Sequence, residues 1–423
     1  MMKMVNSLSL NGTGRRGLSF GSPRVPNSPR VGFYRKSLVS RSFEILIVIC
    51  LLLSFLIAMG CGYIYVFPNL SQAIHAYGVL PNNSSIATCD VFEGSWIRDS
   101  SYPLYNGSEC PFAEQGFNCL ANGRKDDEYL KWRWKPDSCD IPQFNVHKIL
   151  DGLRGKRIVF VGDSMSRTQW ESLICLLMTG VEDKKSVYEV NGNKITKQIR
   201  FLGVRFGSFN FTVEFYRSVY LVQPGPKPRH SPKRVKWTLK LDNLDDISRQ
   251  WIDSDVLIFN TGQWWNEGKL FQTGGYFQVG GPPVKLGMQI TTGFRTALTT
   301  WASWVETMVN TNRTRVFFRT FEPSHWSDQG HRRFCNMTEE PISETKGKDQ
   351  SPFSDIISEV VKNMTVPVTI LRVTLMGAFR SDAHVGKWSD SRSVVDCSHW
   401  CLPGVPDMWN EIVFSSLLSN DGF

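Results

Sequence analysis

The sequence predicts an α/β protein with a mostly parallel sheet, joined to a small cysteine-rich module and an N-terminal transmembrane helix. Beyond residue 143, short apolar runs alternate with stretches of helical periodicity, the pattern of a parallel sheet covered on both faces. A 41% hydrophobic content over 423 residues is enough to build a large core. An uncharged apolar run near the N-terminus has the length of a membrane-spanning helix.

Residues 1–44 are predicted to form a disordered cytosolic tail, because they are rich in Ser, Gly, Pro and Arg and have no apolar period. They hold eight Lys or Arg and a single acid, Glu44, and so account for +7 of the net charge of +9. The rest of the chain is nearly neutral, which predicts that it has no nucleic-acid partner.

Residues 45–67, ILIVICLLLSFLIAMGCGYIYVF, are predicted to be an uncleaved signal anchor. A helix needs ~20 apolar residues to cross a bilayer, and no small-residue cleavage site stands out. The basic residues of the tail all precede this run, so the positive-inside rule sends everything after Phe67 across the membrane. The expected topology is type II, with residues 68–87 as a lumenal stalk.

Glycosylation sequons and cysteine usage both favour a lumenal location. Sequons beyond the anchor include those that begin at Asn82, Asn83, Asn106, Asn210, Asn312, Asn336 and Asn363. Two cysteines, Cys50 and Cys61, lie in the anchor. The remaining even set predicts four disulfides in an oxidising compartment. Its members are Cys89, Cys110, Cys119, Cys139, Cys175, Cys335, Cys397 and Cys401.

Residues 88–142 crowd four of these cysteines together with WRW and YPLY, and their periodicity is weak. We expect a small disulfide-stapled module with too little core to stand alone. Residues 143–423 are predicted to form the main domain. Its expected strands are 157–162, 211–222, 254–262, 315–321 and 368–374, and its expected helices are 164–178, 296–309 and 355–364. Loops are expected at 223–237 and 274–283; the first is basic and is either solvated or touches an acidic polymer.

Ser164 follows the predicted strand RIVFVG and opens the predicted helix SMSRTQWESLICLLM. In open parallel sheets the ligand site lies beyond the carboxyl ends of the strands. A hydroxyl there could act as a nucleophile, since the free amides of a helix N-terminus stabilise a developing oxyanion. The alternative is that Asp163 or Ser164 simply caps the helix.

The C-terminal stretch DCSHWCLPGVPDMWNE changes the balance between these interpretations. A serine nucleophile needs a base, and the base needs an acid to hold its tautomer. Asp396 and His399 are three residues apart, so one helical turn or one tight loop could place their side chains together. The competing interpretation is a zinc site formed by Cys397, His399 and Cys401, which an oxidising compartment disfavours.

Five stretches together closely resemble the plant trichome birefringence-like family of polysaccharide O-acetyltransferases. They are VGDSMSRTQW, DCSHWCLPGVPDMWNE, CDVFEGSW, GFNCLANGRKDDEYLKWRWKP and FNTGQWW, and the likeness spans about residues 88–415. The resemblance implies an SGNH-hydrolase-like α/β/α sandwich, the PC-esterase domain, in a type II protein of the Golgi membrane. Many members have His where this chain has Gln263, so no role is expected of that side chain.

The resemblance implies that Ser164 is the nucleophile, that His399 is its base, and that Asp396 orients the base. It also implies the disulfides Cys89–Cys139, Cys110–Cys175, Cys119–Cys397 and Cys335–Cys401, whereas sequence alone leaves 105 pairings of eight cysteines open.

Four further residues are candidates for the site. Asn260, after the strand DVLIF, could join the Ser164 amide in an oxyanion hole or could be a turn asparagine. Trp264 and Trp400 flank the expected site and could stack on sugar rings, although a tryptophan more often belongs to the core. Arg167 is either a substrate contact or a charge on the helix surface.

The expected reaction is ping-pong acetyl transfer through an acetyl-serine to a hydroxyl of a wall polysaccharide. The acceptor could be xylan, xyloglucan, mannan or pectin. The expected donor is acetyl-CoA or another lumenal donor; no bound cofactor and no metal are expected. An acetylesterase would use the same triad with water, and a pectin-binding or other wall-polymer-binding protein with a vestigial triad is the non-catalytic alternative.

Overall fold

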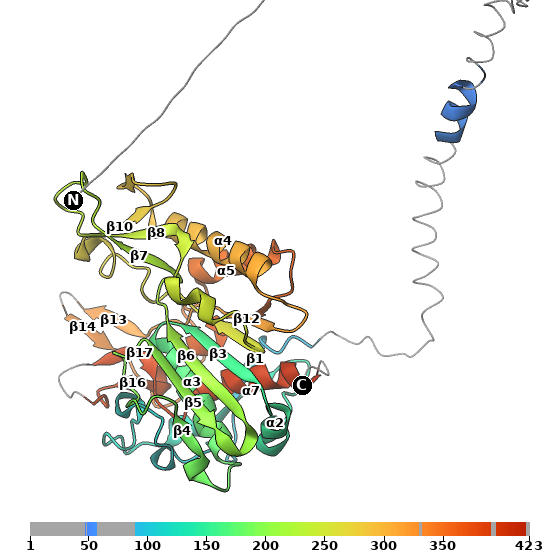
Figure 1. Cartoon of the computed structure of the whole chain (residues 1–423). Coiled ribbons are helices and arrows are strands. Elements are labelled where there is room, and N and C mark those ends of the chain that lie inside the picture. Colours follow the sequence, from blue (N-terminus) through green and yellow to red (C-terminus); the bar gives the residue numbers. More distant parts are fainter. Residues whose placement is uncertain (1–46, 48, 57–88, 330–331, 391–394, 420–423) are drawn as a thin grey trace, which may run out of the picture. The chain divides into compact units, whose positions relative to one another are not determined.

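The computed structural model describes residues 47, 49–56, 89–329, 332–390 and 395–419 (Figure 1). The chain divides into two compact units, Met1–Ser85 and Ile86–Phe423. In the first unit residues 49–56 are helical, and their side chains are exposed. Among the described residues no helix has the length and apolar character needed to cross a bilayer. Most of the predicted anchor, and all of the predicted tail and stalk, lie outside the described residues.

A mixed seven-stranded sheet organises the second unit (Figure 1). In spatial order its strands are β15 (Thr369–Leu371), β12 (Arg315–Arg319), β9 (Val256–Phe259), β3 (Arg157–Gly162), β6 (Phe211–Arg217), β5 (Phe201–Phe206) and β4 (Val187–Glu189). The five strands from β15 to β6 are parallel to one another, and β5 and β4 run antiparallel at one edge. The predicted mostly parallel sheet is therefore confirmed.

Helices cover both faces of this sheet. Along β3, Ile158 and Phe160 belong to one buried cluster, whereas Val159 and Val161 belong to another. That alternation is the period of a strand buried on both sides. The first cluster includes residues of α2 (Val146–Gly152), α3 (Ser164–Met178) and α7 (Val405–Ser419); the second includes residues of α4 (Ile290–Met308) and α5 (Pro352–Lys362). The α/β/α layering is thus present.

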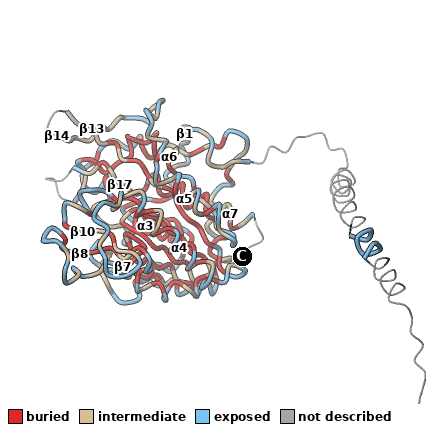
Figure 2. Tube along the Cα trace, turned by 90° about the horizontal axis from the view of Figure 1, so that it is seen from above, coloured by how far each residue is buried: buried red, intermediate tan, exposed pale blue. Residues whose placement is uncertain are grey.

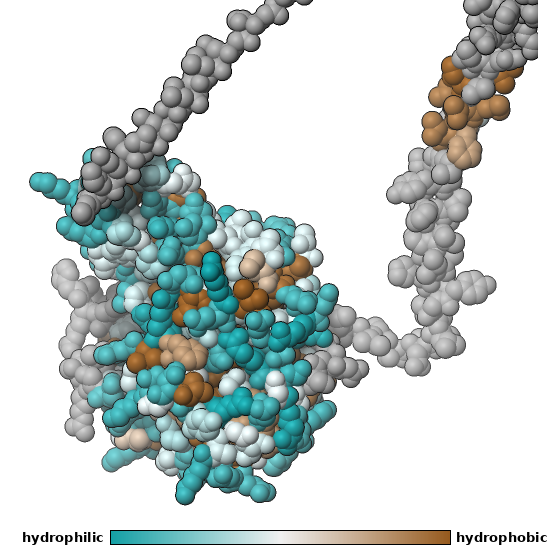
Figure 3. Space-filling model, in the orientation of Figure 1, coloured by the Kyte–Doolittle hydropathy of each residue, from teal (hydrophilic) through white to brown (hydrophobic). Residues whose placement is uncertain are grey.

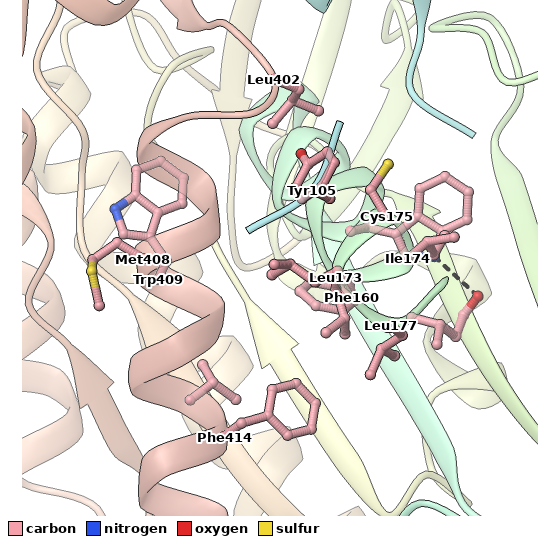
Figure 4. Packing of buried hydrophobic residues seen from close by; sticks show 14 of the residues in the cluster. Tyr105, Phe160, Leu173, Ile174, Cys175, Leu177, Leu402, Met408, Trp409 and Phe414 are labelled. Atoms are coloured by element: carbon pink, nitrogen blue, oxygen red, sulfur yellow. Dashed lines mark hydrogen bonds between the residues drawn. The ribbon is translucent and has the colours of Figure 1, made fainter. Parts of the chain in front are cut away.

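The packing of α3 against α7 joins the two ends of the main domain (Figure 4). Every residue of α3 from Met165 to Met178 is buried, and Figure 2 shows the helix enclosed within the unit. Polar groups on the two helices are paired: Asn410 Nδ2 donates to the Gln169 carbonyl at 3.0 Å and to Ser172 Oγ at 2.9 Å. These bonds fix the register of α7 on α3.

The structure corrects three expectations. Residues 211–222 do not form one strand, and residues 223–237 and 274–283 are not simply loops. The chain leaves β6 at Ser218, turns through Leu221 with a φ of 60°, and enters a second sheet. That sheet has the order β11 (Val284–Lys285), β10 (Gly275–Gln278), β8 (Trp237–Leu244), β7 (Val222–Pro226). The proline-rich stretch therefore supplies the edge strand β7, a position that tolerates proline because one side of the strand needs no donor. The glycine-rich stretch supplies β10, which lies between β11 and β8.

The N-terminal module shares its core with the main domain. Its hairpin pairs β1 (Gly94–Arg98) with β2 (Trp132–Pro136), and Trp134 is fully buried in the cluster that holds α3 and α7. Trp96 Nε1 donates to the Met376 carbonyl at 2.9 Å, from the module to the short helix α6 (Thr374–Ala378). The module is therefore part of the packing that supports the main domain.

Two further hairpins lie near the C-terminal motif. One pairs β13 (Trp326–Gln329) with β14 (Arg332–Cys335), and the other pairs β16 (His384–Gly386) with β17 (Asp396–Trp400). Eight short 3₁₀ turns complete the described elements: Gly107–Glu109, Gln115–Phe117, Glu128–Leu130, Lys184–Ser186, Gly207–Phe209, Asp246–Gln250, Phe271–Thr273 and Ser381–Ala383. In the view of Figure 3 the hydrophilic residues predominate, and apolar residues form small separate groups.

All eight cysteines that follow the predicted anchor are paired, but two predicted pairings are wrong. Cys89–Cys139 and Cys110–Cys175 are as expected. The other two bonds are Cys119–Cys401 and Cys335–Cys397, not Cys119–Cys397 and Cys335–Cys401. The first half of β17 lies beside the β13–β14 hairpin, since His325 N donates to the Cys397 carbonyl at 3.1 Å. The end of β17 meets the module, since Leu402 N donates to the Phe117 carbonyl at 2.8 Å.

Two buried carboxyl groups of α7 face the N-terminal module. Glu411 accepts from Tyr102 Oη at 2.8 Å, and Asp407 accepts from Tyr105 Oη at 3.1 Å and from Ser172 Oγ at 2.6 Å. Burial raises the pKa of Glu411 from 4.5 to about 8, and the Asp407 charge adds to this. Burial also raises the pKa of Asp407 from 3.8 to about 7. Burial thus favours the neutral form of both groups.

We predict that Glu411→Gln flattens the dependence of stability on pH. A raised folded-state pKa adds stability that is full below the unfolded pKa and is lost as the pH rises through the folded pKa. The melting temperature of the wild type should therefore fall between about pH 5 and about pH 8, and that of the variant should fall less. Thermal unfolding followed by circular dichroism measures this, with exposed Glu182→Gln as the control. If the melting temperatures of the wild type and both variants changed equally with pH, the prediction would be contradicted.

Candidate active site

The turn from β3 into α3 gives each residue of the Gly-Asp-Ser motif a separate task. A Cβ on Gly162 would lie 1.9 Å from Asn260 Oδ1, so only glycine fits. Asp163 is the N-cap, and its Oδ1 accepts from Met165 N at 2.9 Å. The cap is thus supplied by Asp163, which leaves the hydroxyl of Ser164 free for another role.

The C-terminal motif lies on a bulged strand rather than on the helical turn or tight loop expected from its spacing. β17 pairs with β16 through His384↔Trp400 and Gly386↔Asp396, so the longer stretch on β17 bulges out between these pairs. The bulge lets Asp396 Oδ1 accept from the backbone amides of Ser398 and His399, at 2.9 Å and 3.0 Å. The carboxylate and the imidazole of one short segment are thereby held side by side.

The structure brings the three predicted catalytic side chains together. Ser164 Oγ lies 2.6 Å from His399 Nε2, and His399 Nδ1 lies 2.6 Å from Asp396 Oδ2. Burial by itself would raise the pKa of Asp396, but the hydrogen bonds and charge of His399 hold that pKa well below its ordinary value. Asp396 is therefore a carboxylate that accepts the Nδ1 proton, which leaves the Nε2 lone pair of His399 to accept the serine proton.

The triad opens into a cavity of about 500 Å³. The cavity is lined by Glu114, Gly116, Phe117, Ser164, Met165, Arg167, Lys197, Arg217, Gln263, Trp264, Lys269, Ser389, Asp390, Asp396, Ser398 and His399. Its size is that of pockets that enclose a drug-sized ligand. The main domain provides most of the lining, and the N-terminal module contributes three residues at the Phe117 side.

One backbone amide at the site is free for a developing oxyanion. The N–H of Ser164, as the first residue of α3, has no acceptor within the helix, whereas the N–H of Met165 is already bonded to Asp163. Asn260 does not line the cavity: its Nδ2 donates to Asp163 Oδ1 at 3.0 Å, and its Oδ1 accepts from Asp163 N at 3.3 Å. Asn260 therefore braces the cap, and the oxyanion role predicted for it receives no support from this geometry.

The predicted substrate contacts divide into two that line the cavity and one that does not. Trp264 and Arg167 are in the lining. Trp400 is fully buried outside it and stacks on His384 with ring centroids 4.0 Å apart, so the expectation that it binds substrate is wrong. On β17 the side chains of His399 and Trp400 point to opposite faces, and only the first points into the cavity.

Arg167 is neither a surface charge nor an unpaired substrate contact. Only 2% of Arg167 is exposed, and its guanidinium forms ion pairs with Glu114 and Glu171. Burial raises the pKa of Glu171 to about 7, and the Arg167 charge opposes this. Since Glu114 belongs to the module and Arg167 to the first turn of α3, this cluster joins the module to the helix that begins at Ser164.

A buried pair of histidines behind the triad was missed in the sequence. His384 Nδ1 lies 3.1 Å from the carbonyl oxygen of His399, His384 Nε2 lies 2.7 Å from His325 Nδ1, and His325 Nε2 lies 2.9 Å from the Ala378 carbonyl. The only available indication was that the chain has just seven histidines. Neither the sequence SHW around His325 nor the sequence DAHV around His384 indicates that these two side chains would meet.

Two neutral histidines carry too few protons to fill all the hydrogen bonds of this pair. Its three contacts need three N–H protons, but two neutral imidazoles supply only two. Filling every contact would require one positive charge, and burial lowers the pKa of both rings, with the charge of His325 adding to the effect on His384. With both rings neutral, which burial favours, one of the three contacts lacks a proton.

The cysteines near His399 are not available as metal ligands. Cys397 is bonded to Cys335 and Cys401 to Cys119, and the imidazole nitrogens of His399 contact Ser164 and Asp396. The two sulfurs of the zinc alternative are thus in disulfides that bracket the catalytic segment.

Models of two known protein families together match most of the chain. A family model described as "GDSL/SGNH-like Acyl-Esterase family found in Pmr5 and Cas1p" matches residues 141–416, and one described as "PMR5 N terminal Domain" matches residues 87–140. The Arabidopsis thaliana "Protein trichome berefringence-like 7" is 62% identical over 415 residues, which is 96% of this chain and 92% of that protein.

Two further Arabidopsis thaliana proteins show the same relationship. "Protein trichome birefringence-like 6" is 43% identical over 344 residues, which is 79% of this chain and 71% of that protein. "Protein trichome birefringence-like 9" is 42% identical over 364 residues, which is 81% of this chain and 87% of that protein.

We predict that the Cys335–Cys397 bond supports the reactivity of Ser164 more than it supports the fold. Replacing both cysteines by serine should slow the labelling of Ser164 by a fluorophosphonate probe by about tenfold or more, because small misplacements of catalytic groups have large effects on rate. The matched control is Cys89→Ser with Cys139→Ser, since these bonds join residues 62 and 50 apart and closing similar loops has similar effects on stability. Equal labelling rates in the two double variants would contradict the prediction.

Proposed function

The chain belongs to the trichome birefringence-like family and contains its acyl-esterase-like domain, and from this premise we propose that it transfers acetyl groups to hydroxyls of a plant cell-wall polysaccharide. The observation that carries the proposal is the pair of 2.6 Å contacts linking Ser164 Oγ, His399 and Asp396. A vestigial site in a binding protein would have no need to keep three side chains from distant segments in this geometry.

In the first half-reaction, Ser164 Oγ attacks the acetyl carbonyl of the donor while His399 Nε2 takes the serine proton. The carbonyl oxygen becomes an oxyanion, which the free Ser164 amide at the start of α3 stabilises. When the tetrahedral intermediate collapses, the bond to the donor's leaving group breaks, and the leaving group takes the proton from His399. The products are acetyl-Ser164 and the deacetylated donor, which is the free thiol of coenzyme A if acetyl-CoA is the donor, or the deacetylated form of another lumenal donor.

In the second half-reaction, His399 takes the proton of a sugar hydroxyl, whose oxygen attacks acetyl-Ser164. Collapse breaks the bond to Ser164 Oγ, and His399 returns the proton to the serine. Asp396 stays ionised throughout and stabilises the imidazolium that forms in each half. Water in place of the sugar would give an acetylesterase with the same residues, so binding of the acceptor in the open cavity decides between the two reactions.

We predict that donor without acceptor leaves one acetyl group on Ser164. Intact-mass measurement and peptide mapping detect this intermediate, and a matching wall oligosaccharide should discharge it faster than water does. Ser164→Ala should abolish acetylation with little change in melting temperature, because Asp163 supplies the helix cap. Asp396→Asn should reduce turnover by roughly 10⁴-fold, as loss of the orienting carboxylate does in another triad.

Two outcomes would count against this function. Discharge at the same rate with and without every acceptor would favour the esterase. An unmodified Ser164 in an active preparation would exclude the acetyl-serine mechanism. Ser398→Ala is the matched control, since Ser398 also lines the cavity but its hydroxyl accepts from Trp326 Nε1 at 3.0 Å.

For location, we propose a single-pass type II protein of the Golgi membrane with the triad in the lumen. The basic tail, the uncharged run 45–67 and the four disulfides support this orientation. The five sequon asparagines within the described residues are exposed, as a glycosylated chain requires. They are Asn106, Asn210, Asn312, Asn336 and Asn363.

We predict that protease added to sealed Golgi vesicles removes only residues before Ile45, because the membrane shields the remainder. Immunoblotting with tags at both ends measures this, and detergent-opened vesicles are the control. Cleavage beyond Phe67 in intact vesicles would contradict the topology.

A further inference from the structure

Gln263 lines the catalytic cavity, although the sequence predicts no role for it. It follows β9, and Phe259 of β9 pairs in parallel register with Val161 of β3. Ser164 and Gln263 therefore leave the same edge of the sheet from neighbouring strands, three and four residues beyond this pair. Both side chains reach the cavity at that edge, where the ligand of an open parallel sheet binds.

The nitrogen of the Gln263 amide is committed to the protein. Nε2 donates to the main-chain carbonyl of Glu322 at 2.7 Å. A carbonyl oxygen only accepts hydrogen bonds, so a turned amide would place its own oxygen against another acceptor. It would also remove a donor from the main chain of a buried residue. The amide is thus held with its nitrogen towards Glu322 and its Oε1 away from it.

The groups that hold Gln263 are themselves restrained. Glu322 is 1% exposed and forms an ion pair with Arg319, the last residue of β12. The guanidinium of Arg319 lies over the ring of Trp409 on α7, 4.3 Å from its centroid. On the main chain, the Gln263 carbonyl accepts from Asn266 Nδ2 at 2.8 Å. A side chain held in this way loses little freedom when it binds a ligand.

The oxygen of the Gln263 amide is available to a ligand. Within the described ranges of the chain, no group donates a hydrogen bond to Oε1, and the residue is half-buried in the cavity lining. The three cations of the lining, Lys197, Arg217 and Lys269, are donors only. Gln263 therefore provides an uncharged acceptor, which suits a hydroxyl group and would repel an oxyanion.

We propose that Gln263 Oε1 accepts a hydrogen bond from the sugar hydroxyl adjacent to the one that attacks acetyl-Ser164. This inference rests on the proposed function and assigns a specificity-determining residue to it. Adjacent hydroxyls of a pyranose are carried by bonded carbon atoms, so holding one of them orients the other. A sugar whose neighbouring hydroxyl is already acetylated has no proton to donate and leaves Oε1 unpaired. The protein therefore selects sugars on which this neighbour is free, and adds one acetyl group to each.

The test measures the second half-reaction alone. Full-length protein is acetylated with 4-nitrophenyl acetate, which replaces the natural donor, and discharge of acetyl-Ser164 is followed by intact-mass measurement. The acceptors are methyl 4-O-methyl-β-D-xylopyranoside and the corresponding mannopyranoside, each compared with the deoxy sugar that lacks the neighbouring hydroxyl but keeps the acetylated one. We expect the wild type to prefer the complete sugar about tenfold in kcat/KM, because a site built to bind a hydroxyl rejects the analogue without it.

Variants of Gln263 identify the contact. Gln263→Met should lower kcat/KM for the complete sugar about tenfold and leave that for the deoxy sugar unchanged, so the preference disappears. Gln263→His should keep the preference near pH 8, where a neutral imidazole has one donor and one acceptor, and lose it near pH 5, where both ring nitrogens donate. Titration of His399 affects both acceptors equally and cancels in their ratio. Gln143→Met, at an exposed glutamine outside the cavity lining, is the control.

Equal kcat/KM values of the wild type for the complete and deoxy sugars would overturn the proposal. So would an equal loss for both sugars in Gln263→Met, which would assign Gln263 to the structure of its turn. Slower acetylation of Ser164 with unchanged discharge would assign the residue to the donor and would also overturn it. Formation of acetyl-Ser164 tests the triad separately, so failure of the proposed function and failure of this contact give different results.

Discussion

The 2.6 Å contact between Ser164 Oγ and His399 Nε2 joins residues 235 positions apart, and the rest of the structure serves to maintain it. A contact of this kind tolerates displacements of only about half an ångström. Neither partner can ensure it locally, because Ser164 begins α3 at the carboxyl edge of the sheet and His399 lies on a strand outside that sheet. The position of His399 must be imposed by its surroundings on every side.

Three sets of interactions fix the position of His399. The disulfides Cys335–Cys397 and Cys119–Cys401 hold the segment at both ends, one to the β13–β14 hairpin and one to the N-terminal module. Beneath the strand, His384 contacts the His399 carbonyl and stacks on Trp400. Beyond the strand, α7 packs on α3, so the helix that begins at Ser164 and the helix that follows His399 share one buried interface. The cysteine-rich module is thereby a structural component of the site.

The charges around the cavity are distributed unevenly, and this distribution has a physical basis. Arg167, Glu114 and Glu171 form a cluster in which each charge has a partner, with Arg167 and Glu171 buried, and Asp396 has His399. Buried charges without partners are strongly disfavoured. The half-buried Arg217 beside Trp264 has no such partner among the described residues, and it lies where a ligand could supply one. The paired charges join the elements that surround the triad.

The sequence by itself determined the elements whose cause is local. β3 and α3 follow from a continuous apolar run and a capped helix, and α3 has the predicted limits, Ser164–Met178. The identity of the triad also came from the sequence, because the Gly-Asp-Ser and Asp-x-x-His motifs together resemble those of one family.

Only the tertiary structure could decide matters that depend on which distant surfaces meet. The pairing of Cys397 with Cys335 follows from the hairpin beside β17, and the burial of Trp400 follows from the face of that strand on which it lies. The same holds for Asn260, which the sequence left open as an oxyanion donor or a turn asparagine and whose amide fills the space that Gly162 leaves open. It also holds for His325 and His384, whose contact depends on a fold that brings together residues 59 positions apart.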